Sequence, residues 1–196
     1  MARLKNLTIA SVVLAGVFVF TSDAQQARKD AQSSYEPRSD PGAGQKFLSR
    51  FAGHWTVVKT FYPRSGAPAV AMGECHQTMI HGGRFLRSEF LFHDSSGDTT
   101  GLGVIGFEAD SGLFTSFWTD SRSTRVSIRH SEAPFDGKEI RMVSRTLDSE
   151  QQRRSRTLTH LEDDDRRIVH QQFVAGADGK ERLIMQLVMT RKAESK

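Results

Sequence analysis

The feature that most constrains the fold is a succession of short stretches rich in apolar and β-branched residues. Ten such stretches of 6 to 11 residues follow one another along the chain, and six of the nine segments between them contain glycine turn signals. In these turns glycine supplies positive φ, and Asp or Ser bonds to its own backbone. The pattern predicts strands over His54–Tyr62, Val70–Ile80, Arg84–His93, Thr100–Phe107, Leu113–Asp120, Arg125–His130, Glu139–Thr146, Arg154–Leu161, Arg167–Val174 and Arg182–Arg191.

Ten antiparallel strands joined by short connections form a meander. A meander of this length loses its two exposed edges when it closes into an up-and-down barrel. We therefore predict an all-β fold: an antiparallel up-and-down barrel of about ten strands over residues 45–192, followed by a short tail at 193–196. A short helix is predicted in front of the barrel at Gln45–Phe51, where Phe47, Leu48 and Phe51 have helical spacing.

Period-two alternation supports the strands. Along Arg125–His130, Val126, Ile128 and His130 share one face and the remaining residues share the other. One face of such a strand lies inside the barrel and the other in water. The stretch Arg84–His93 is more mixed, but a ten-stranded barrel is wide enough to hold a cavity, whose lining can include polar residues.

The start of the chain predicts export. Arg3 and Lys5 precede an apolar run from Leu7 to Phe20, and small residues at Ser22 and Ala24 follow it. These are the three parts of a Sec signal peptide, which we predict over residues 1–24. A run of about 14 residues is short of the roughly 20 that span a bilayer as a helix, so we predict no stable membrane anchor after cleavage. An uncleaved anchor is the alternative. The expected location is periplasmic or extracellular.

Residues 25–44 are polar and poor in large apolar groups. Ser33, Ser34, Pro37, Pro41 and Gly42 are typical of this segment. Such a composition cannot bury a core, so we predict a flexible linker.

Charge and cysteine usage narrow the function classes. Removal of Arg3, Lys5 and Asp23 with the leader leaves 25 basic and 22 acidic side chains, from 27 and 23 in the full chain, a net charge of +3 with histidine neutral. The charges are interspersed, so no nucleic-acid partner is predicted. The one cysteine, Cys75, excludes an intramolecular disulfide, and we interpret it as a small strand residue. The oligomeric state stays open.

Two sequence patterns could indicate a cofactor or metal site. Gly101 to Gly106 fits the dinucleotide pattern G-x-G-x-x-G, but no helix follows it to receive a phosphate. The glycines instead indicate a bend in a strand or room inside a cavity. His130, His160 and His170 could share a cavity, yet neither H-E-x-x-H nor C-x-x-C occurs. We predict no metal site and no cofactor, and keep single-histidine haem binding as an alternative.

The block Gly53-His54-Trp55 at the head of the first strand resembles the start of lipocalin-like (calycin) barrels. The resemblance implies that Trp55 plugs the closed end of the barrel. It also implies that a basic residue near the end of the last strand packs over this indole, and Arg191 is in place for that role. Gly53, Trp55 and Arg191 are thus predicted to form a structural barrel-end motif.

Four longer blocks resemble one bacterial family, the domain of unknown function 1579. They are Phe51–Trp55, Ile80–Leu86, Gly103–Phe107 and Phe117–Asp120. The resemblance covers Gln45 to Lys192 and implies a lipocalin-like barrel without an established reaction. It therefore assigns no catalytic residue. Members often carry a small or acidic residue where this chain has His54.

These observations lead to one functional hypothesis and three alternatives. We expect a small apolar or amphipathic ligand in the barrel lumen, held against apolar side chains with a few polar groups setting its orientation. The predicted ligand-binding residues are Trp118, Asp120, Arg87, Phe90 and His130. The first alternative is an enzyme on the same barrel, with Asp120, Arg87 or a histidine acting in acid–base catalysis. The other two are a haem-type cofactor binder and a surface-interaction protein with a filled core.

Overall fold

The computed structural model describes residues 20–35, 39–94, 97–145, 154–176 and 178–193. It divides into two units, Met1–Ser39 and Asp40–Lys196. The apolar run of the predicted signal peptide lies outside the described residues up to its last position, Phe20. Within the part of the chain that is described, no helix is long and apolar enough to cross a membrane.

Among the described residues of the first unit lies the helix α1 (Phe20–Tyr35). It covers residues 25–35 of the segment predicted to be a flexible linker, where the sequence analysis expected no helix. Ala, Gln, Arg and Lys fill its middle, and all four have high helix propensity. The Gln26 side chain donates a hydrogen bond of 2.9 Å to Asp30, one turn further along. A role of the segment as a linker stays a prediction.

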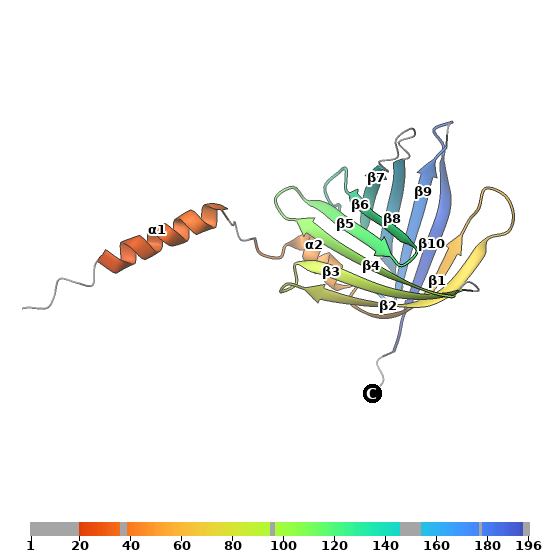
Figure 1. The fold of residues 1–196 in the computed structure, drawn as a ribbon, viewed down its shortest axis with the longest axis horizontal. Helices are drawn as coiled ribbons and strands as arrows, with labels where there is room; N and C mark the ends of the chain where they lie inside the picture. The colour runs from red at the N-terminus through yellow and green to blue at the C-terminus, as the bar shows by residue number, and fades with distance from the viewer. Residues whose placement is uncertain (1–19, 36–38, 95–96, 146–153, 177, 194–196) are drawn as a thin grey trace, which may run out of the picture. The chain divides into compact units, whose positions relative to one another are not determined.

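The second unit is a closed antiparallel barrel in which each strand pairs with its neighbours in sequence, and the first strand pairs with the last. Figure 1 shows the strands in this order around the barrel. The strands are β1 (Gly53–Phe61), β2 (Ala69–Ile80), β3 (Phe85–Asp94), β4 (Gly97–Glu108), β5 (Leu113–Asp120), β6 (Ser123–His130), β7 (Glu139–Arg145), β8 (Arg154–Glu162), β9 (Arg167–Ala175) and β10 (Glu181–Arg191).

The predicted fold class is confirmed. Every predicted strand is present, with boundaries that differ by at most three residues. Closure is complete because β1 pairs with β10 from Trp55↔Arg191 to Phe61↔Met185, which leaves neither strand with a free edge over that length.

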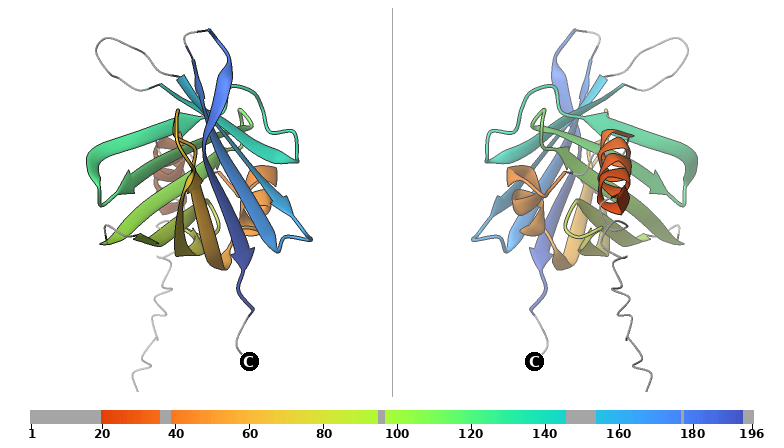
Figure 2. Two further views of the ribbon diagram at one scale, coloured as in Figure 1. Left: turned by 90° about the vertical axis from the view of Figure 1, so that its right-hand side faces the viewer. Right: turned by 90° about the vertical axis from the view of Figure 1, so that its left-hand side faces the viewer.

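A short helix, α2 (Ala43–Ser49), lies at one end of the barrel and starts two residues earlier than predicted. Leu48 and Phe47 are buried on its inner side, as is Phe51 just beyond it. Gln45 fixes its start, because its side chain accepts a hydrogen bond from the Gly42 N–H and donates one of 2.7 Å to the Phe107 carbonyl of β4. We call this end of the barrel, which also holds Trp55, the closed end. Figure 2 shows the tilted strands from two sides, with α2 beside the β8–β9 turn.

An aromatic cluster packs beneath α2. The rings of Phe47 and Phe114 both contact Phe135, at centroid distances of 4.8 and 5.1 Å. Phe135 belongs to the segment between β6 and β7, so this long connection is part of the core. The contact explains how a connection of eight residues keeps a fixed path across the barrel end.

The weakest seam of the wall lies between β6 and β7. These strands are paired at His130↔Val143 alone, whereas β7 and β8 are paired at seven positions. Val126 and Ile128, on the outer face of β6, expose 59% and 62% of their surface. The apolar face of this strand is therefore the outer one.

Candidate functional site

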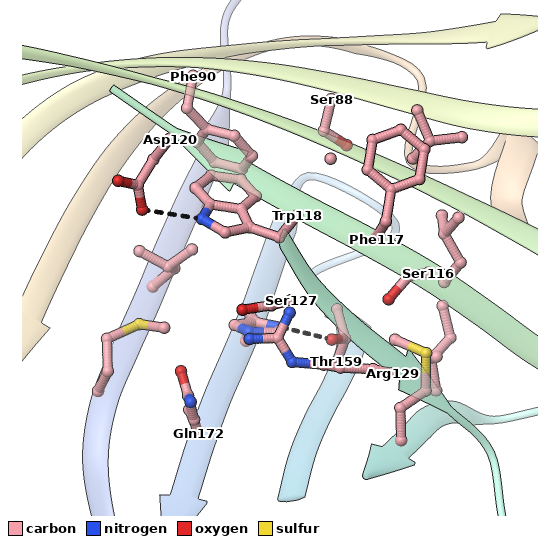
Figure 3. Close-up of a pocket in the computed structure, with 18 of the residues that line it drawn as sticks. Ser88, Phe90, Ser116, Phe117, Trp118, Asp120, Ser127, Arg129, Thr159 and Gln172 are labelled. Carbon is pink, nitrogen blue, oxygen red and sulfur yellow. Dashed lines mark hydrogen bonds between the residues drawn. The ribbon is translucent and has the colours of Figure 1, made fainter. Parts of the chain in front are cut away.

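The barrel encloses a cavity of about 420 Å³. Its floor is formed by Leu48 and Phe51 at the closed end. Its apolar wall comes from residues on five strands, β3, β4, β5, β7 and β10: Leu86, Phe90, Phe92, Ile105, Trp118, Ile140, Met142, Met185, Leu187 and Met189. Polar side chains lie among them, and those of Ser88, Ser116, Ser127 and Gln172 are shown in Figure 3. The lining is thus apolar with a few polar groups, which is the usual composition of a small-molecule site.

The closed end is held by Trp55 and Arg191. Trp55 is fully buried, and its indole N–H donates a hydrogen bond of 3.0 Å to the Phe51 carbonyl. The Arg191 guanidinium lies over the indole ring, with Cζ 4.2 Å from the ring centroid. A cation over the negative face of an indole is attracted by it. Gly53 has φ +139°, and a Cβ there would lie 2.5 Å from Nη1 of Arg191, so the arginine needs a glycine at this position.

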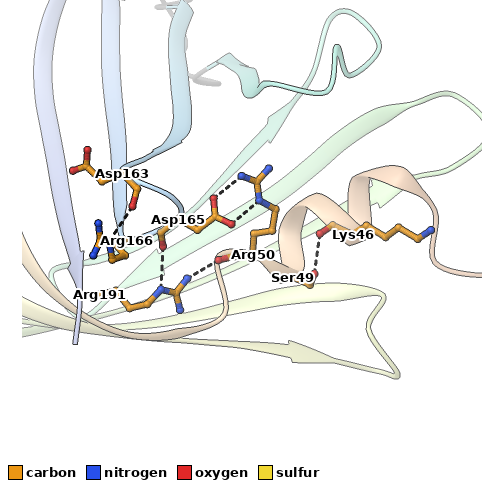
Figure 4. Close-up of polar contacts among 7 residues, drawn as sticks. All are labelled: Lys46, Ser49, Arg50, Asp163, Asp165, Arg166 and Arg191. Carbon is orange, nitrogen blue, oxygen red and sulfur yellow. Dashed lines mark hydrogen bonds and ion pairs between the residues drawn. The ribbon is translucent and has the colours of Figure 1, made fainter. Parts of the chain in front are cut away.

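Arg191 also ties three chain segments together. Its guanidinium donates hydrogen bonds of 2.7 Å to the carbonyls of Arg50 and Ala52, just after α2, and one of 3.0 Å to the carbonyl of Asp165 in the β8–β9 turn. Carbonyls at the end of a helix have no partner within the helix. Arg191 satisfies two carbonyls of the segment that follows α2 and so fixes the floor of the cavity. Figure 4 shows its hydrogen bonds to the carbonyls of Arg50 and Asp165.

A salt bridge reinforces the same end. Arg50 donates two hydrogen bonds to the Asp165 carboxylate, the longer of 2.8 Å. The Arg50 guanidinium lowers the pKa of Asp165 from its usual range. The pair is half-exposed, so it contributes orientation more than stability.

At the opposite end, which we call the mouth, Trp118 and Asp120 form a fixed unit with Arg122. The Trp118 indole N–H donates a hydrogen bond of 3.1 Å to Oδ2 of Asp120 (Figure 3). Arg122 donates to both carboxylate oxygens, with Nη2 2.9 Å from Oδ2 and its backbone N–H 3.0 Å from Oδ1. These bonds, the one from the Arg122 side chain foremost, lower the pKa of Asp120 to about 2. Asp120 is therefore a carboxylate with its acceptors occupied, which makes it a poor general base.

Two glycines of the G-x-G-x-x-G pattern, Gly101 and Gly103, make room for Trp118. A Cβ on Gly101 would lie 2.3 Å from Cη2 of this indole, and one on Gly103 would lie 3.3 Å from Cε3. Gly103 is the cross-strand partner of Trp118. Both glycines therefore let a large ring lie flat against β4 inside the barrel. This agrees with the interpretation that the glycines provide room inside a cavity.

Lys59 adds a buried cation near the mouth. Its side chain lines the cavity, and Nζ lies 3.8 Å from the centroid of the Phe92 ring. Burial lowers the pKa of Lys59, and the nearby Arg122 lowers it further. Contact with an aromatic face compensates part of the lost hydration.

Deeper in the cavity, Arg129 and His170 approach each other from β6 and β9. His170 accepts or donates a hydrogen bond of 2.7 Å between Nδ1 and the Thr159 hydroxyl. Burial, together with the charge of Arg129, lowers the pKa of His170 to about 3, so the ring is neutral at physiological pH. Burial also lowers the pKa of Arg129, whose Nε has no hydrogen-bond partner among the described residues.

The structure brings three of the five predicted ligand residues to the cavity, namely Phe90, Trp118 and Asp120. The structure corrects the predicted placement of Arg87 in the lumen. Arg87 is an odd number of positions from Phe90, so when Phe90 points inward Arg87 points outward, where it pairs with Glu89 at 3.1 Å. His130 is the second correction, because it lies on the outer face of β6 and is exposed. A ligand-binding role for the three inward residues stays a prediction.

The three candidate histidines do not share the cavity. Only His170 among them lines it. His160 points outward and lies 2.9 Å from the Glu162 carboxylate. Over the described ranges, no group of three His, Cys, Asp or Glu side chains is arranged to hold a metal ion. Cys75 is buried against the core, and burial raises the pKa of its thiol, which leaves it unreactive.

The sequence reasoning missed Arg129, Lys59 and Arg122, and it named His170 only among the three histidines considered for a shared metal or haem site. For β6, the turn before the strand indicates which residues point into the barrel. A two-residue turn at Ser121 and Arg122 pairs Asp120 with Ser123, so residues an even number from Ser123 share the face of Asp120. This places Arg129 inside and His130 outside. An irregularity shifts the register so that Trp118 pairs with Ser127, but a shift by two leaves the faces unchanged.

Two comparisons with known proteins give matches. The family model described as protein of unknown function (DUF1579) matches residues 40–191. Among solved structures, the S-type phycobiliprotein lyase CPES from Guillardia theta is similar, with a TM-score of 0.51 and 11% sequence identity over 78% of this chain and 94% of that chain. No curated protein matches. The structural likeness concerns the fold alone.

Proposed function

Because the chain belongs to the family described as protein of unknown function (DUF1579), for which that description assigns no activity, we propose a function from the barrel itself. The protein binds a small amphipathic molecule in its lumen. The single observation that supports this is the cavity of about 420 Å³, closed below by α2 and lined by apolar side chains with few polar groups.

The volume of this cavity is the main argument. Small-molecule sites have volumes of roughly 300–1,000 Å³, and protein interiors are otherwise packed almost without voids. A barrel that served as a filled scaffold would close this space with larger side chains. The wall instead carries small side chains at Ser88, Ser116 and Ser127, which line the cavity from β3, β5 and β6. These small residues keep the lumen open.

Three methionines make the lumen adaptable. Met142, Met185 and Met189 line the cavity from β7 and β10. Unbranched thioethers adjust their shape to irregular apolar partners. They suit a ligand with a flexible hydrocarbon part better than a rigid planar one.

The proposal is tested by filling the lumen. Ser116 on β5 points into the cavity, and its neighbour Thr115 is exposed on the outer wall. Ser116→Phe places a ring in the binding space, and Thr115→Phe places the same ring outside. With both variants shown to be folded by circular dichroism, native mass spectrometry measures binding of added 1-dodecanol. Loss in Ser116→Phe alone supports the proposal, and absence of binding to the wild type contradicts it.

We propose further that the protein works outside the cytoplasm. The support is the sequence of residues 1–24, with its basic start, apolar run and small residues at Ser22 and Ala24. Cell fractionation with N-terminal sequencing of the mature chain tests this. A mature start near Gln25 in the exported fraction supports the proposal, and an intact Met1 start in the cytoplasm contradicts it.

A further inference from the structure

The charges inside the cavity are not balanced. Three cationic side chains, Lys59, Arg122 and Arg129, line it against one acidic side chain, Asp120. Asp120 accepts its hydrogen bonds from Arg122 and Trp118, so it is not free to serve Arg129. Within the described part of the chain, the side-chain Nε of Arg129 is buried and has no hydrogen-bond partner. A buried cation without a partner is costly to the folded protein.

The inward direction of the Arg129 side chain is determined by the pairing of β6 with β5. Its cross-strand partner is Ser116, which also lines the cavity, so the β5–β6 register directs both side chains inward. Figure 3 shows Arg129 with Ser127, Thr159 and Gln172 in one part of the pocket, below Trp118. Four polar side chains from β6, β8 and β9 thus surround one region of an otherwise apolar space.

His170 completes this region. Its Nδ1 is engaged by Thr159, and its ring is neutral because burial and Arg129 disfavour its protonated form. A neutral ring does not compete with Arg129 for an anion and adds no further positive charge. The region therefore carries a single guanidinium together with neutral hydrogen-bonding groups.

We infer that Arg129 anchors the carboxylate of an amphipathic acid whose apolar tail fills the methionine- and phenylalanine-lined part of the lumen. This rests on the proposed lumen-binding function and names the head group. A planar guanidinium matches a carboxylate with two parallel hydrogen bonds. One guanidinium also suits one negative charge, whereas a phosphate monoester carries about −1.5 to −2 at pH 7 and would demand more cations.

The cost of burying Arg129 is consistent with this role. Its Nε is buried without a hydrogen-bond partner among the described residues, and an incoming carboxylate would supply one. Groups that favour binding at the expense of stability are typical of functional sites. Replacement of Arg129 by an apolar side chain of similar length is therefore expected to keep or raise stability, which makes the variant usable in binding tests.

The experiment compares dodecanoate with 1-dodecanol, which has the same tail without the charge, by isothermal titration calorimetry. The proteins are the wild type, Arg129→Met and Arg125→Met. Arg125 is an exposed arginine of the same strand that does not line the cavity. The wild type and Arg125→Met should bind dodecanoate more tightly than dodecanol. Arg129→Met should lose about tenfold to hundredfold in affinity for dodecanoate, the range for a hydrogen-bonded charge, and none for dodecanol.

The other possible results of this experiment separate failure of the head-group assignment from failure of lumen binding. Equal binding of the two ligands by the wild type, unchanged in Arg129→Met, overturns the assignment of the head group and leaves lumen binding intact. Tighter binding of dodecyl phosphate than of dodecanoate overturns the carboxylate in favour of a phosphate. Failure of all three ligands to bind the wild type overturns the proposed function together with this inference. Arg129→Lys, which keeps the charge but not the planar fork, should bind dodecanoate with intermediate affinity.

Discussion

The indole nitrogen of Trp118 lies 3.1 Å from Oδ2 of Asp120, two residues further along the same face of β5. This bond holds a large ring across the mouth side of the cavity, where it contacts Phe90 at a centroid distance of 5.4 Å. Arg122 binds the same carboxylate from the turn. The three residues thus connect the cavity wall to the rim of the barrel, and Gly101 provides the surface on which the ring rests.

Gly101→Ala should destabilise the protein through this ring. The new methyl group would lie 2.3 Å from Cη2 of Trp118, so the indole must move and loses its bond to Asp120. Overpacking of this kind costs about 1–3 kcal/mol of unfolding free energy, measured by urea denaturation. In a Trp118→Leu background the same change should cost less. Equal costs in both backgrounds would show that the indole is not the cause.

Asp120 should contribute to stability at neutral pH and lose this contribution in strong acid. Its pKa is about 2 in the folded protein against 3.8 for an unperturbed aspartate, because Arg122 and Trp118 hydrogen-bond the charged form. The folded state thus binds the proton less readily, so the contribution is full above pH 3.8 and disappears as the pH falls through about 2. Unfolding free energies of Asp120→Asn should lack this acid-dependent component. An unchanged profile would contradict the assignment.

His170 should make stability depend on pH in a higher range. Its folded pKa is about 3 against 6.5 for an unperturbed histidine. Between these values the unfolded chain binds a proton that the folded protein does not, so stability falls as the pH drops from 6.5 towards 3. His170→Gln removes the titrating group and should flatten the profile in this window. NMR titration of the His170 ring provides an independent check, and protonation near pH 6 would contradict the buried position.

Arg191→Met should weaken the closed end strongly. The change removes three hydrogen bonds to the carbonyls of Arg50, Ala52 and Asp165 and the contact over Trp55. Because a hydrogen bond to a charged group contributes about 1.5–3 kcal/mol net, we expect a loss of at least about 2 kcal/mol in unfolding free energy. Arg182→Met on the same strand is the matched control, since this exposed arginine makes one backbone bond, to Tyr62. Similar losses in the two variants would contradict the account.

The fold was predictable because β-structure of this kind is encoded locally. Each strand is marked by its own alternation and its own turn residues, so the Asp-Gly and Ser-Gly pairs placed most boundaries within a residue or two. The barrel-end motif has a local signature as well, since the structure places Arg191 over Trp55 at 4.2 Å. Helix α1 was not anticipated, because polar composition alone does not distinguish a linker from an exposed helix.

The site was less predictable because it depends on register between strands. Arg87 was grouped with Phe90 although alternation alone separates their faces. His130 was grouped with Trp118, and only the pairing of Asp120 with Ser123 shows that it points outward. Arg129 and His170 are 41 residues apart in the sequence, yet in the barrel the charge of Arg129 acts on His170, a proximity that no local pattern contains.

The most direct test of lumen binding uses the methionine methyl groups as reporters. Met142, Met185 and Met189 line the cavity, whereas Met72 is on the outer wall with 55% of its surface exposed. In protein labelled with ¹³C at the methionine methyls, NMR spectra are recorded during titration with dodecanoate. Saturable shifts of the three lumen methyl signals with Met72 unchanged are the predicted result. Unchanged lumen signals, or shifts confined to Met72, would contradict binding of an amphipathic ligand inside the barrel.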